Sequence, residues 1–210
     1  MCEQFPVGSR HMKQILLMIA LVALVALVAL VGCGKKEPVQ PSVSNSTTPL
    51  PFAETKAKAE AGNADAQNNL GVMYVNGEGV EQDFKEALKW FQKAADQGNV
   101  NAQYNLGVRY VKGQGVDQNF NEAFKLWQKI ADQGYADAQA SLGWMYYMGD
   151  GVLKDYVTAY AWGHIAEANG SERAEDNKSV VAKKMTPAQI VEAEELVKEM
   201  VEKNPKLLNK

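Results

Sequence analysis

The sequence predicts an all-α protein: an α/α solenoid of helical hairpins with a C-terminal pair of capping helices, preceded by a signal and anchor segment and a disordered linker. Three observations predict this fold class. The chain repeats every 36 residues, apolar residues recur at helical spacing within each repeat, and a glycine-rich turn divides each repeat into two helices. The period is marked by four glycines: Gly62, Gly98, Gly134 and Gly170.

The N-terminal residues 1–32 are predicted to be a secretory signal peptide. Met12 is the expected true start, because residues 1–11 fit no targeting pattern. Lys13 precedes an unbroken apolar run over residues 15–31, and small residues follow that run. The run is slightly shorter than the roughly 20 apolar residues that span a bilayer. An uncleaved helix in the inner membrane therefore stays open as an alternative.

The four residues Leu-Val-Gly-Cys at 30–33 resemble a bacterial lipobox. That resemblance implies cleavage before Cys33 and lipid attachment at Cys33, which makes the membrane a partner of the chain. Gly34 stands where an Asp would resemble an inner-membrane retention signal, so we expect the outer membrane, on its periplasmic side. The segment 33–52 is rich in Pro, Ser and Thr, which cannot build a core, and it is predicted to be a tether.

The first helix of each repeat is predicted from apolar residues spaced four apart, such as Ala66, Leu70 and Tyr74. The three copies align without a gap. Gly71 and its equivalents cost a helix about 1 kcal/mol relative to Ala, so we expect the second helix to approach closely there, at Ala87 and its equivalents. The copies occupy 63–98, 99–134 and 135–170.

A Gly-x-Gly-Val turn and a second helix complete each copy. In the first copy, Gly77 is expected to end the first helix in the left-handed conformation, and Gly79 to serve the turn. Asp83 and Glu86 have the spacing of a capping box at the start of the second helix. The inward stripe of that helix includes Trp90.

The full pattern, AQxxLGxxYxxGxGVxxDxxxAxxWxxKAAxxG, resembles the Sel1-like repeat, a relative of the tetratricopeptide repeat, over residues 63–170. This resemblance implies an array of helical hairpins that binds proteins. The third copy departs from the pattern, because Gly163, His164 and Glu167 replace an aromatic residue, a Lys and an Ala. We therefore expect its second helix to face an end cap.

Both ends of the array are predicted to be capped, as a solenoid requires. Residues 53–62 are expected to form a half-repeat helix, and residues 171–210 a pair of capping helices. In the first capping helix, Val180, Val181 and Met185 are expected to face inward. The second is expected to begin at an N-cap Thr186 with Gln189 three residues on. The apolar stripe of the second helix is Ile190, Ala193, Val197, Met200 and Val201.

The first helices also present residues that vary between copies while the core positions repeat. A solenoid of this kind lines its concave surface with these helices, so we expect a protein or peptide partner there. The chain is accordingly predicted to be a membrane-tethered adaptor or scaffold of the bacterial cell envelope. The candidate contact residues are Asn69, Met73, Asn76, Asn105, Arg109, Lys112, Ser141, Trp144, Met145 and Met148.

The composition argues against other functional classes of protein. The chain carries 22 Lys and Arg against 25 Asp and Glu, whereas nucleic-acid binders normally show a basic excess. Two His and two Cys poorly supply a zinc site or a disulfide framework. We expect no nucleic-acid partner, no metal and no cofactor.

An enzyme is not expected either, because no GxSxG, SxxK or HExxH motif is present. His164 is read as a packed or capping residue, and no catalytic residue is assigned. The alternative is an envelope enzyme or a glycan- or β-lactam-binding protein. Some Sel1-like proteins have been linked to β-lactams, but those are rich in cysteine.

Overall fold

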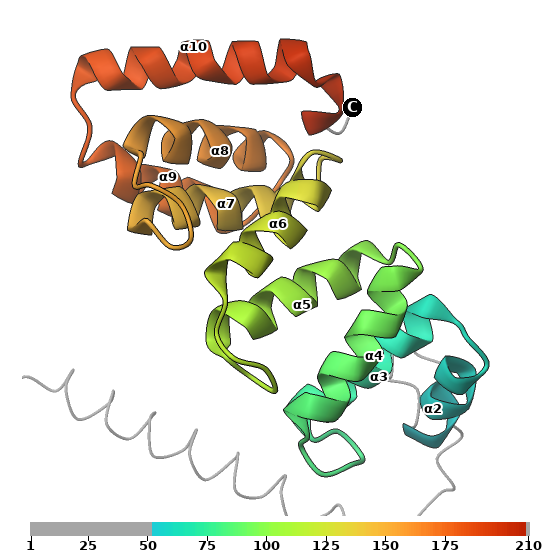
Figure 1. Cartoon of the computed structure of the whole chain (residues 1–210). Helices are drawn as coiled ribbons and strands as arrows, with labels where there is room; N and C mark the ends of the chain where they lie inside the picture. The colour runs from blue at the N-terminus through green and yellow to red at the C-terminus, as the bar shows by residue number, and fades with distance from the viewer. Residues whose placement is uncertain (1–51, 209–210) are drawn as a thin grey trace, which may run out of the picture. The chain divides into compact units, whose positions relative to one another are not determined.

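The computed structural model describes residues 52–208, and this part of the chain is entirely helical (Figure 1). The predicted all-α fold class is confirmed. The signal peptide, Cys33 and the linker up to residue 51 lie outside the described residues. The α-helices are α2 (Phe52–Glu60), α3 (Ala64–Asn76), α4 (Phe84–Asp96), α5 (Val100–Lys112), α6 (Phe120–Ala131), α7 (Ala136–Met148), α8 (Tyr156–Ala168), α9 (Ala174–Ala182) and α10 (Pro187–Lys203), followed by the 3-10 helix η1 (Pro205–Leu207).

Each 36-residue repeat forms one hairpin: α3 with α4, α5 with α6, and α7 with α8. The first helix of each hairpin ends at a glycine in the left-handed conformation, and in the first copy Gly77 has φ +72° and donates its N–H to the carbonyl of Met73. The second turn glycine permits a close approach, because a Cβ on Gly115 would lie 2.4 Å from the carbonyl oxygen of Phe84. The glycine pair thus both ends the helix and packs the turn on the preceding repeat.

The glycine inside each first helix gives room to the second helix, as expected, but the partner differs from the expected alanine in two hairpins. A Cβ on Gly71 would lie 2.6 Å from the ring of Phe91, and one on Gly107 would lie 2.2 Å from Nε1 of Trp127. In the third hairpin alone, Gly143 faces the backbone of α8. Aromatic rings therefore fill the space between the helices in the first two hairpins.

The predicted capping boxes of the second helices are only half formed. The Asp83 carboxylate accepts hydrogen bonds from the N–H groups of Lys85 and Glu86, at 2.9 and 3.0 Å. The N–H of Asp83 itself donates to the carbonyl of Tyr74 on the previous helix. Because that donor is already satisfied, Glu86 does not close the box and pairs with Lys89 instead. The full box forms at α10, between Thr186 and Gln189 as predicted.

A buried glutamine ties each first helix to the helix before it. Nε2 of Gln67, Gln103 and Gln139 donates to the carbonyl of the residue eight positions earlier, at 3.1, 3.2 and 3.0 Å. These carbonyls belong to the last turn of the preceding helix, and each also accepts a turn hydrogen bond from the N–H of the glycine three residues on. The glutamine therefore adds a second donor at a helix end and fixes the spacing of successive repeats.

Helix α9 continues the 36-residue register as a fourth first helix. Ala174 is fully buried at the position of Ala138, and Val181 is buried at the position of Met145. Oγ of Ser171 donates to Asp137 at 3.1 Å, which matches the bond from Asn99 to Asp65 two repeats earlier. The array therefore extends half a repeat beyond residue 170.

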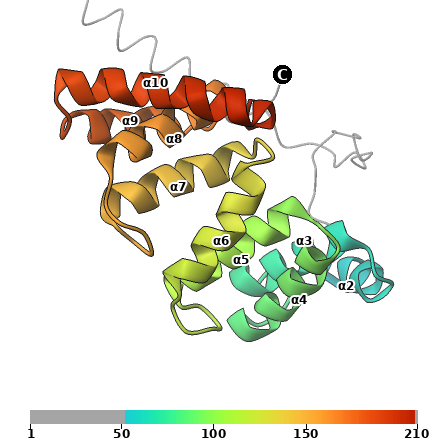
Figure 2. The same cartoon turned by 45° about the horizontal axis from the view of Figure 1, so that its top comes forward.

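One detail of the C-terminal cap differs from the expectation. Val180 is exposed, because it occupies the same position in the repeat as the outward-facing Trp144. Helix α10 packs along α8 (Figure 2), and of its expected apolar stripe Ala193 is buried while Val197 and Met200 are partly buried against the core. The chain then folds back, and the buried Leu207 accepts a hydrogen bond at its carbonyl from Gln139.

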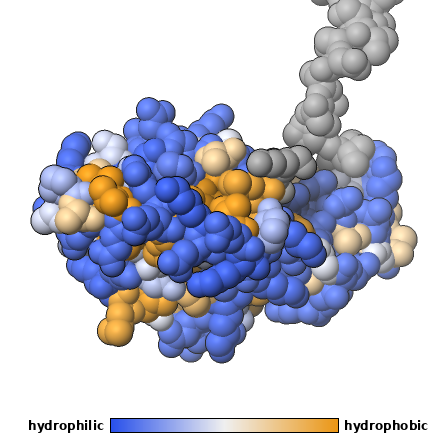
Figure 3. Space-filling view, turned by 90° about the horizontal axis from the view of Figure 1, so that it is seen from above, coloured by the Kyte–Doolittle hydropathy of each residue, from blue (hydrophilic) through white to orange (hydrophobic). Residues whose placement is uncertain are grey.

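The surface on the side of α10 is mainly hydrophilic, with apolar side chains in patches (Figure 3). Between residues 52 and 208, no helix combines the length and the apolar character needed to cross a bilayer.

Candidate functional site

The first helices of the hairpins and α9 share three columns of side chains that are not buried. Residues 36 positions apart in each column occupy equivalent places on α3, α5, α7 and the α9 segment. We call this surface the A-helix face. Its columns are Asn69, Asn105, Ser141 and Asn177; Val72, Val108, Trp144 and Val180; and Asn76, Lys112, Met148 and Lys184.

Three of the predicted contact residues do not lie on this face. Met73, Arg109 and Met145 form a buried column, and Arg109 is only 7% exposed. An interior helix of an array packs both on its own hairpin partner and on the preceding repeat, and Arg109 accordingly lies over the ring of Phe84 on α4. The prediction that Met73, Arg109 and Met145 are exposed contact residues is therefore wrong.

A cavity of about 450 Å³ opens on the A-helix face between the second and third repeats. We call it the α5/α7 pocket. Its apolar side includes Tyr104 and Trp127, whose rings stack with centroids 5.7 Å apart, and Nε1 of Trp127 donates to the Tyr104 carbonyl at 3.1 Å. The lining residues are Tyr104, Val108, Val111, Lys112, Phe120, Trp127, Ala140, Ser141, Trp144, Met145, Asp150, Arg173 and Asn177.

Arg173, just before α9, forms a bridge across the A-helix face. Its Nη2 donates to the Tyr104 hydroxyl at 2.7 Å and lies 3.2 Å from Oδ1 of Asp137. Burial lowers the pKa of Arg173, and its contacts with Tyr104 and Asp137 outweigh this and raise that pKa overall. The bridge therefore joins α5, α7 and the α8–α9 turn with a charged guanidinium.

A second, more open cavity of about 680 Å³ shares Tyr104 and Arg173 with the α5/α7 pocket. It is lined also by Tyr135, whose hydroxyl donates to Asn101 at 2.9 Å. Burial raises the pKa of Tyr135, and the nearby Asp137 carboxylate adds to that rise. The Arg173 bridge thus stands at the common boundary of two cavities.

The structure brings together four of the ten predicted contact residues in the α5/α7 pocket: Lys112, Ser141, Trp144 and Met145. Met145 belongs to the buried column, and the predicted contact residues that are neither buried nor in this lining are dispersed. Asn69 and Asn76 lie on α3, outside the lining. Asn105 already donates to Asn68 at 3.0 Å, and Met148 lies at the end of α7, 46% exposed.

Sequence reasoning missed the residues that the second helices and α9 contribute to the pocket. Phe120 and Trp127 come from α6, while Arg173 and Asn177 come from the α9 segment. The sequence did carry a signal for Asn177, because continuing the 36-residue period places it in the column of Ser141.

The exposed large apolar side chains are concentrated in the third repeat and α9. Of the five large hydrophobic residues that are exposed between residues 52 and 208, four lie in the third repeat or α9: Trp144, Met148, Leu153 and Val180. The ring of Trp144 lies 5.1 Å from that of Tyr147. Trp144 also lines the pocket, and exposed apolar surface of this kind is typical of interaction sites.

No group of three or more His, Cys, Asp or Glu that could hold a metal occurs in the described part of the chain. His164 is half-buried, its Nδ1 has no hydrogen-bond partner within residues 52–208, and it lines neither cavity.

Comparison with known proteins supports the repeat assignment. The Sel1 repeat family matches residues 64–99, 100–135 and 136–171, each boundary one residue later than predicted. No curated protein matches the chain.

The solved structures similar to it include the following two. A protective antigen present in uropathogenic Escherichia coli strains, displaying an SLR fold, is 38% identical, with a TM-score of 0.67 over 74% of this chain and 34% of that one. A Sel1 repeat protein from Oxalobacter formigenes is 37% identical, with a TM-score of 0.53 over 61% of this chain and 96% of that one. The chain thus spans about a third of the antigen's length.

Proposed function

The chain belongs to the Sel1 repeat family, and we propose that it is an adaptor that binds a segment of a partner protein at the α5/α7 pocket. Proteins of this family generally mediate protein–protein interaction and are typically non-enzymatic adaptors or scaffolds.

One observation carries this proposal: an apolar cavity with aromatic walls lies beside an exposed tryptophan, and polar groups surround it. Interface hot spots are enriched in Trp, Tyr and Arg and lie in pockets that exclude water. Trp144, Tyr104 and Arg173 supply these three residue types at one place. A partner side chain inserted there would be enclosed by residues from three first helices.

Photo-crosslinking tests this function in cells that express the full chain. A photoreactive residue replaces Ser141, which lines the pocket, or Lys129, an exposed residue of α6 outside it. We expect a protein adduct from position 141 and none from position 129. Trp144→Ala should remove the adduct without lowering the thermal midpoint of unfolding. Absence of an adduct at position 141, or equal adducts at both positions, would contradict the proposal.

The adaptor is further proposed to be tethered to the outer membrane, facing the periplasm, by lipid on Cys33. The lipobox-like residues 30–33 and the Pro- and Ser-rich linker support this proposal. Cys33→Ser should then release the protein from the membrane fraction. Retention of that variant in the membrane would favour the alternative, an uncleaved helix in the inner membrane.

A second candidate function is the binding of a small molecule, such as a glycan or a β-lactam. The volume of the α5/α7 pocket favours it, since about 450 Å³ lies within the usual range of about 300–1,000 Å³ for small-molecule sites. Equilibrium binding of a labelled penicillin or a peptidoglycan fragment tests it. Saturable binding that Trp144→Ala abolishes would support this candidate.

A further inference from the structure

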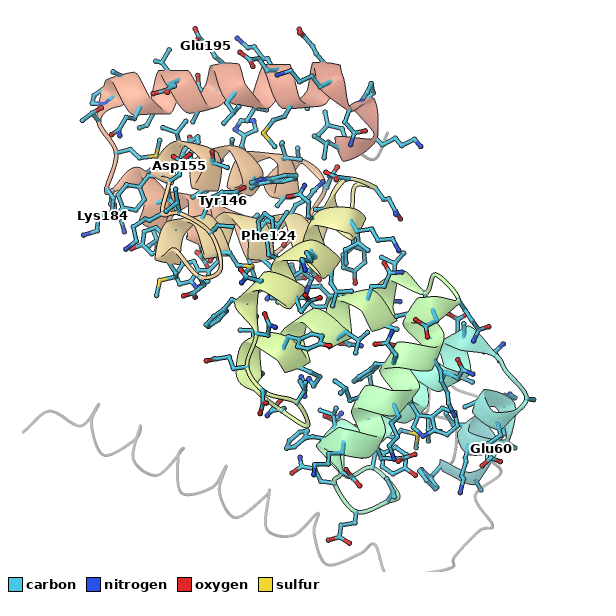
Figure 4. All side chains as sticks on the ribbon, viewed as in Figure 1. Glu60, Phe124, Tyr146, Asp155, Lys184 and Glu195 are labelled. Atoms are coloured by element: carbon cyan, nitrogen blue, oxygen red, sulfur yellow. The ribbon has the colours of Figure 1, made fainter. Side chains whose placement is uncertain are left out.

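Two rows of side chains run across the A-helix face from α5 through α7 to α9. One row is apolar and consists of Val108, Trp144 and Val180. The next row, one helical turn further on, places Met148 between Lys112 and Lys184. Helices α7 and α9 are in contact, and Figure 4 shows Lys184 at the end of α9, directed outward. An apolar strip therefore borders a row that carries two positive charges.

The two lysines of this row have no anionic partner among residues 52–208. Neither Lys112 nor Lys184 makes an ion pair or a side-chain hydrogen bond there. By contrast, Lys89 and Lys125 on the second helices pair with acidic residues three positions earlier. Lys112 and Lys184 are therefore free to pair with carboxylates of a partner.

The acidic residues near this row do not balance it. Asp150 lines the α5/α7 pocket together with Lys112. Asp137 is engaged by Arg173, and Glu172 lines the second cavity. Because Asp137 neutralises Arg173, the cations left without an ion pair are Lys112 and Lys184, and they outnumber the one carboxylate that lines the pocket, Asp150. Complementary charge at an interface selects the partner and speeds association.

We infer that the partner segment is acidic and apolar. Its apolar side chains contact the row of Trp144, and its carboxylates pair with Lys112 and Lys184. This inference rests on the proposed function, because it specifies what the α5/α7 pocket and its surroundings bind. An anionic lipid surface would meet the same two rows, but it could not insert a side chain between α5 and α7, so the pocket favours a peptide.

Defined peptides test the inference with the purified full chain in detergent. The probes are a fluorescent peptide that alternates Glu with Leu and Trp, and a matched peptide in which Lys replaces every Glu. We expect the acidic peptide to bind at least about tenfold more tightly, with an affinity that falls as salt rises. The double variant Lys112→Glu, Lys184→Glu should weaken that binding about tenfold, since two attractions become two repulsions. Lys129→Glu is the control of equal charge and should change nothing.

Three results would overturn the inference. The two peptides could bind equally, the basic peptide could bind more tightly, or vesicles of anionic phospholipid could bind in a lysine-dependent manner while neither peptide binds. Failure of this inference is distinguishable from failure of the proposed function. If a photoreactive residue at position 141 still captures a protein while the peptides are not discriminated by charge, only the acidic chemistry is wrong.

Discussion

The second and third repeats share a backbone plan but are stabilised differently. In the second, the ring of Trp127 lies between the helices and occupies the space left by Gly107. In the third, Gly163 stands in place of that ring, and Gly143 meets the backbone of α8 directly, with a Cβ there only 2.9 Å from the carbonyl oxygen of Ala159. Loss of one ring therefore brings α7 and α8 into closer contact.

The difference accounts for how the array ends. Because Gly163 has no side chain, α9 packs against α8 at this point, and a Cβ on Gly163 would lie 3.4 Å from Cβ of Lys178. Lys178 pairs there with Glu167 in place of the apolar contact of the earlier repeats. A polar pair thus closes the solenoid, and the side chains of α9 complete the A-helix face.

The largest expected effect is a loss of stability that is greater when Gln139 is replaced than when its equivalent Gln103 is replaced. Gln139 makes two hydrogen bonds through Nε2, and its Oε1 accepts a third from Asn169 at 2.7 Å. Gln103 makes one through Nε2, and its Oε1 has no partner within the described residues. At about 1 kcal/mol for each bond, Gln139→Ala should lower the free energy of unfolding by about 3 kcal/mol and Gln103→Ala by about 1 kcal/mol. Urea unfolding measures both, and equal losses would show that the C-terminal turn contributes nothing.

The next largest change in stability is expected to have opposite signs at two glycines of one hairpin, Gly143 on α7 and Gly163 on α8. Gly143→Ala should destabilise the protein by about 1–2 kcal/mol, because its Cβ meets a carbonyl that cannot move alone, and the gain in helix propensity offsets only about 1 kcal/mol of that cost. Gly163→Ala meets only an ordinary contact and should stabilise the protein by up to about 1 kcal/mol. Thermal unfolding of both variants checks the signs. A stabilised Gly143→Ala would contradict the close contact between α7 and the backbone of α8.

A smaller effect is expected at Arg109, whose replacement should stabilise the protein. Burial lowers the pKa of its guanidinium, and Nε has no hydrogen-bond partner among residues 52–208. Its equivalents in the first and third repeats are Met73 and Met145. Arg109→Met should therefore raise the free energy of unfolding by about 1 kcal/mol, since an unpaired buried charge is unfavourable. Partner capture at position 141 should be unchanged. A destabilised variant would show that the guanidinium makes a stabilising contact.

The repeat and its hairpins could be predicted from the sequence because each signature residue has a local cause. Gly77 and its equivalents end the first helices in the left-handed conformation, and Thr186 caps α10. The half-formed capping boxes could not be predicted, since the N–H of Asp83 bonds to the carbonyl of Tyr74 on another helix. Pairing between helices decides that detail, and spacing within one helix does not report it.

The site was harder to predict for two physical reasons. A helical wheel drawn for a single helix assumes that one side of the helix is buried. A helix inside an array is buried on two sides, and Arg109 and the other residues of its column lie on the second buried side. Helix α9 also lacks the repeat's apolar signature, because Lys178 replaces the leucine of the earlier copies. Only the buried Ala174 and Val181 retain the register there.

The smallest expected effect concerns the pH dependence of the third repeat. Burial raises the pKa of Tyr146, whose ring lies edge-on to Phe124 across α6 and α7 (Figure 4), and the Asp155 carboxylate adds to that rise. A raised pKa in the folded state means that the neutral phenol stabilises the fold. That stability is complete below the ordinary tyrosine pKa of about 10 and is lost as the pH rises through the folded value.

Asp155→Asn, which installs the N-cap residue found at position 119 of the second repeat, isolates the electrostatic part of this effect. The asparagine retains the cap but removes the carboxylate charge, so the pKa of Tyr146 should fall toward its ordinary value. Stability should then depend less steeply on pH in the alkaline range, as measured by urea unfolding at a series of pH values. Tyr146→Phe should remove the contribution of this group altogether. An unchanged alkaline slope in Tyr146→Phe would mean that a different residue of the folded chain titrates there.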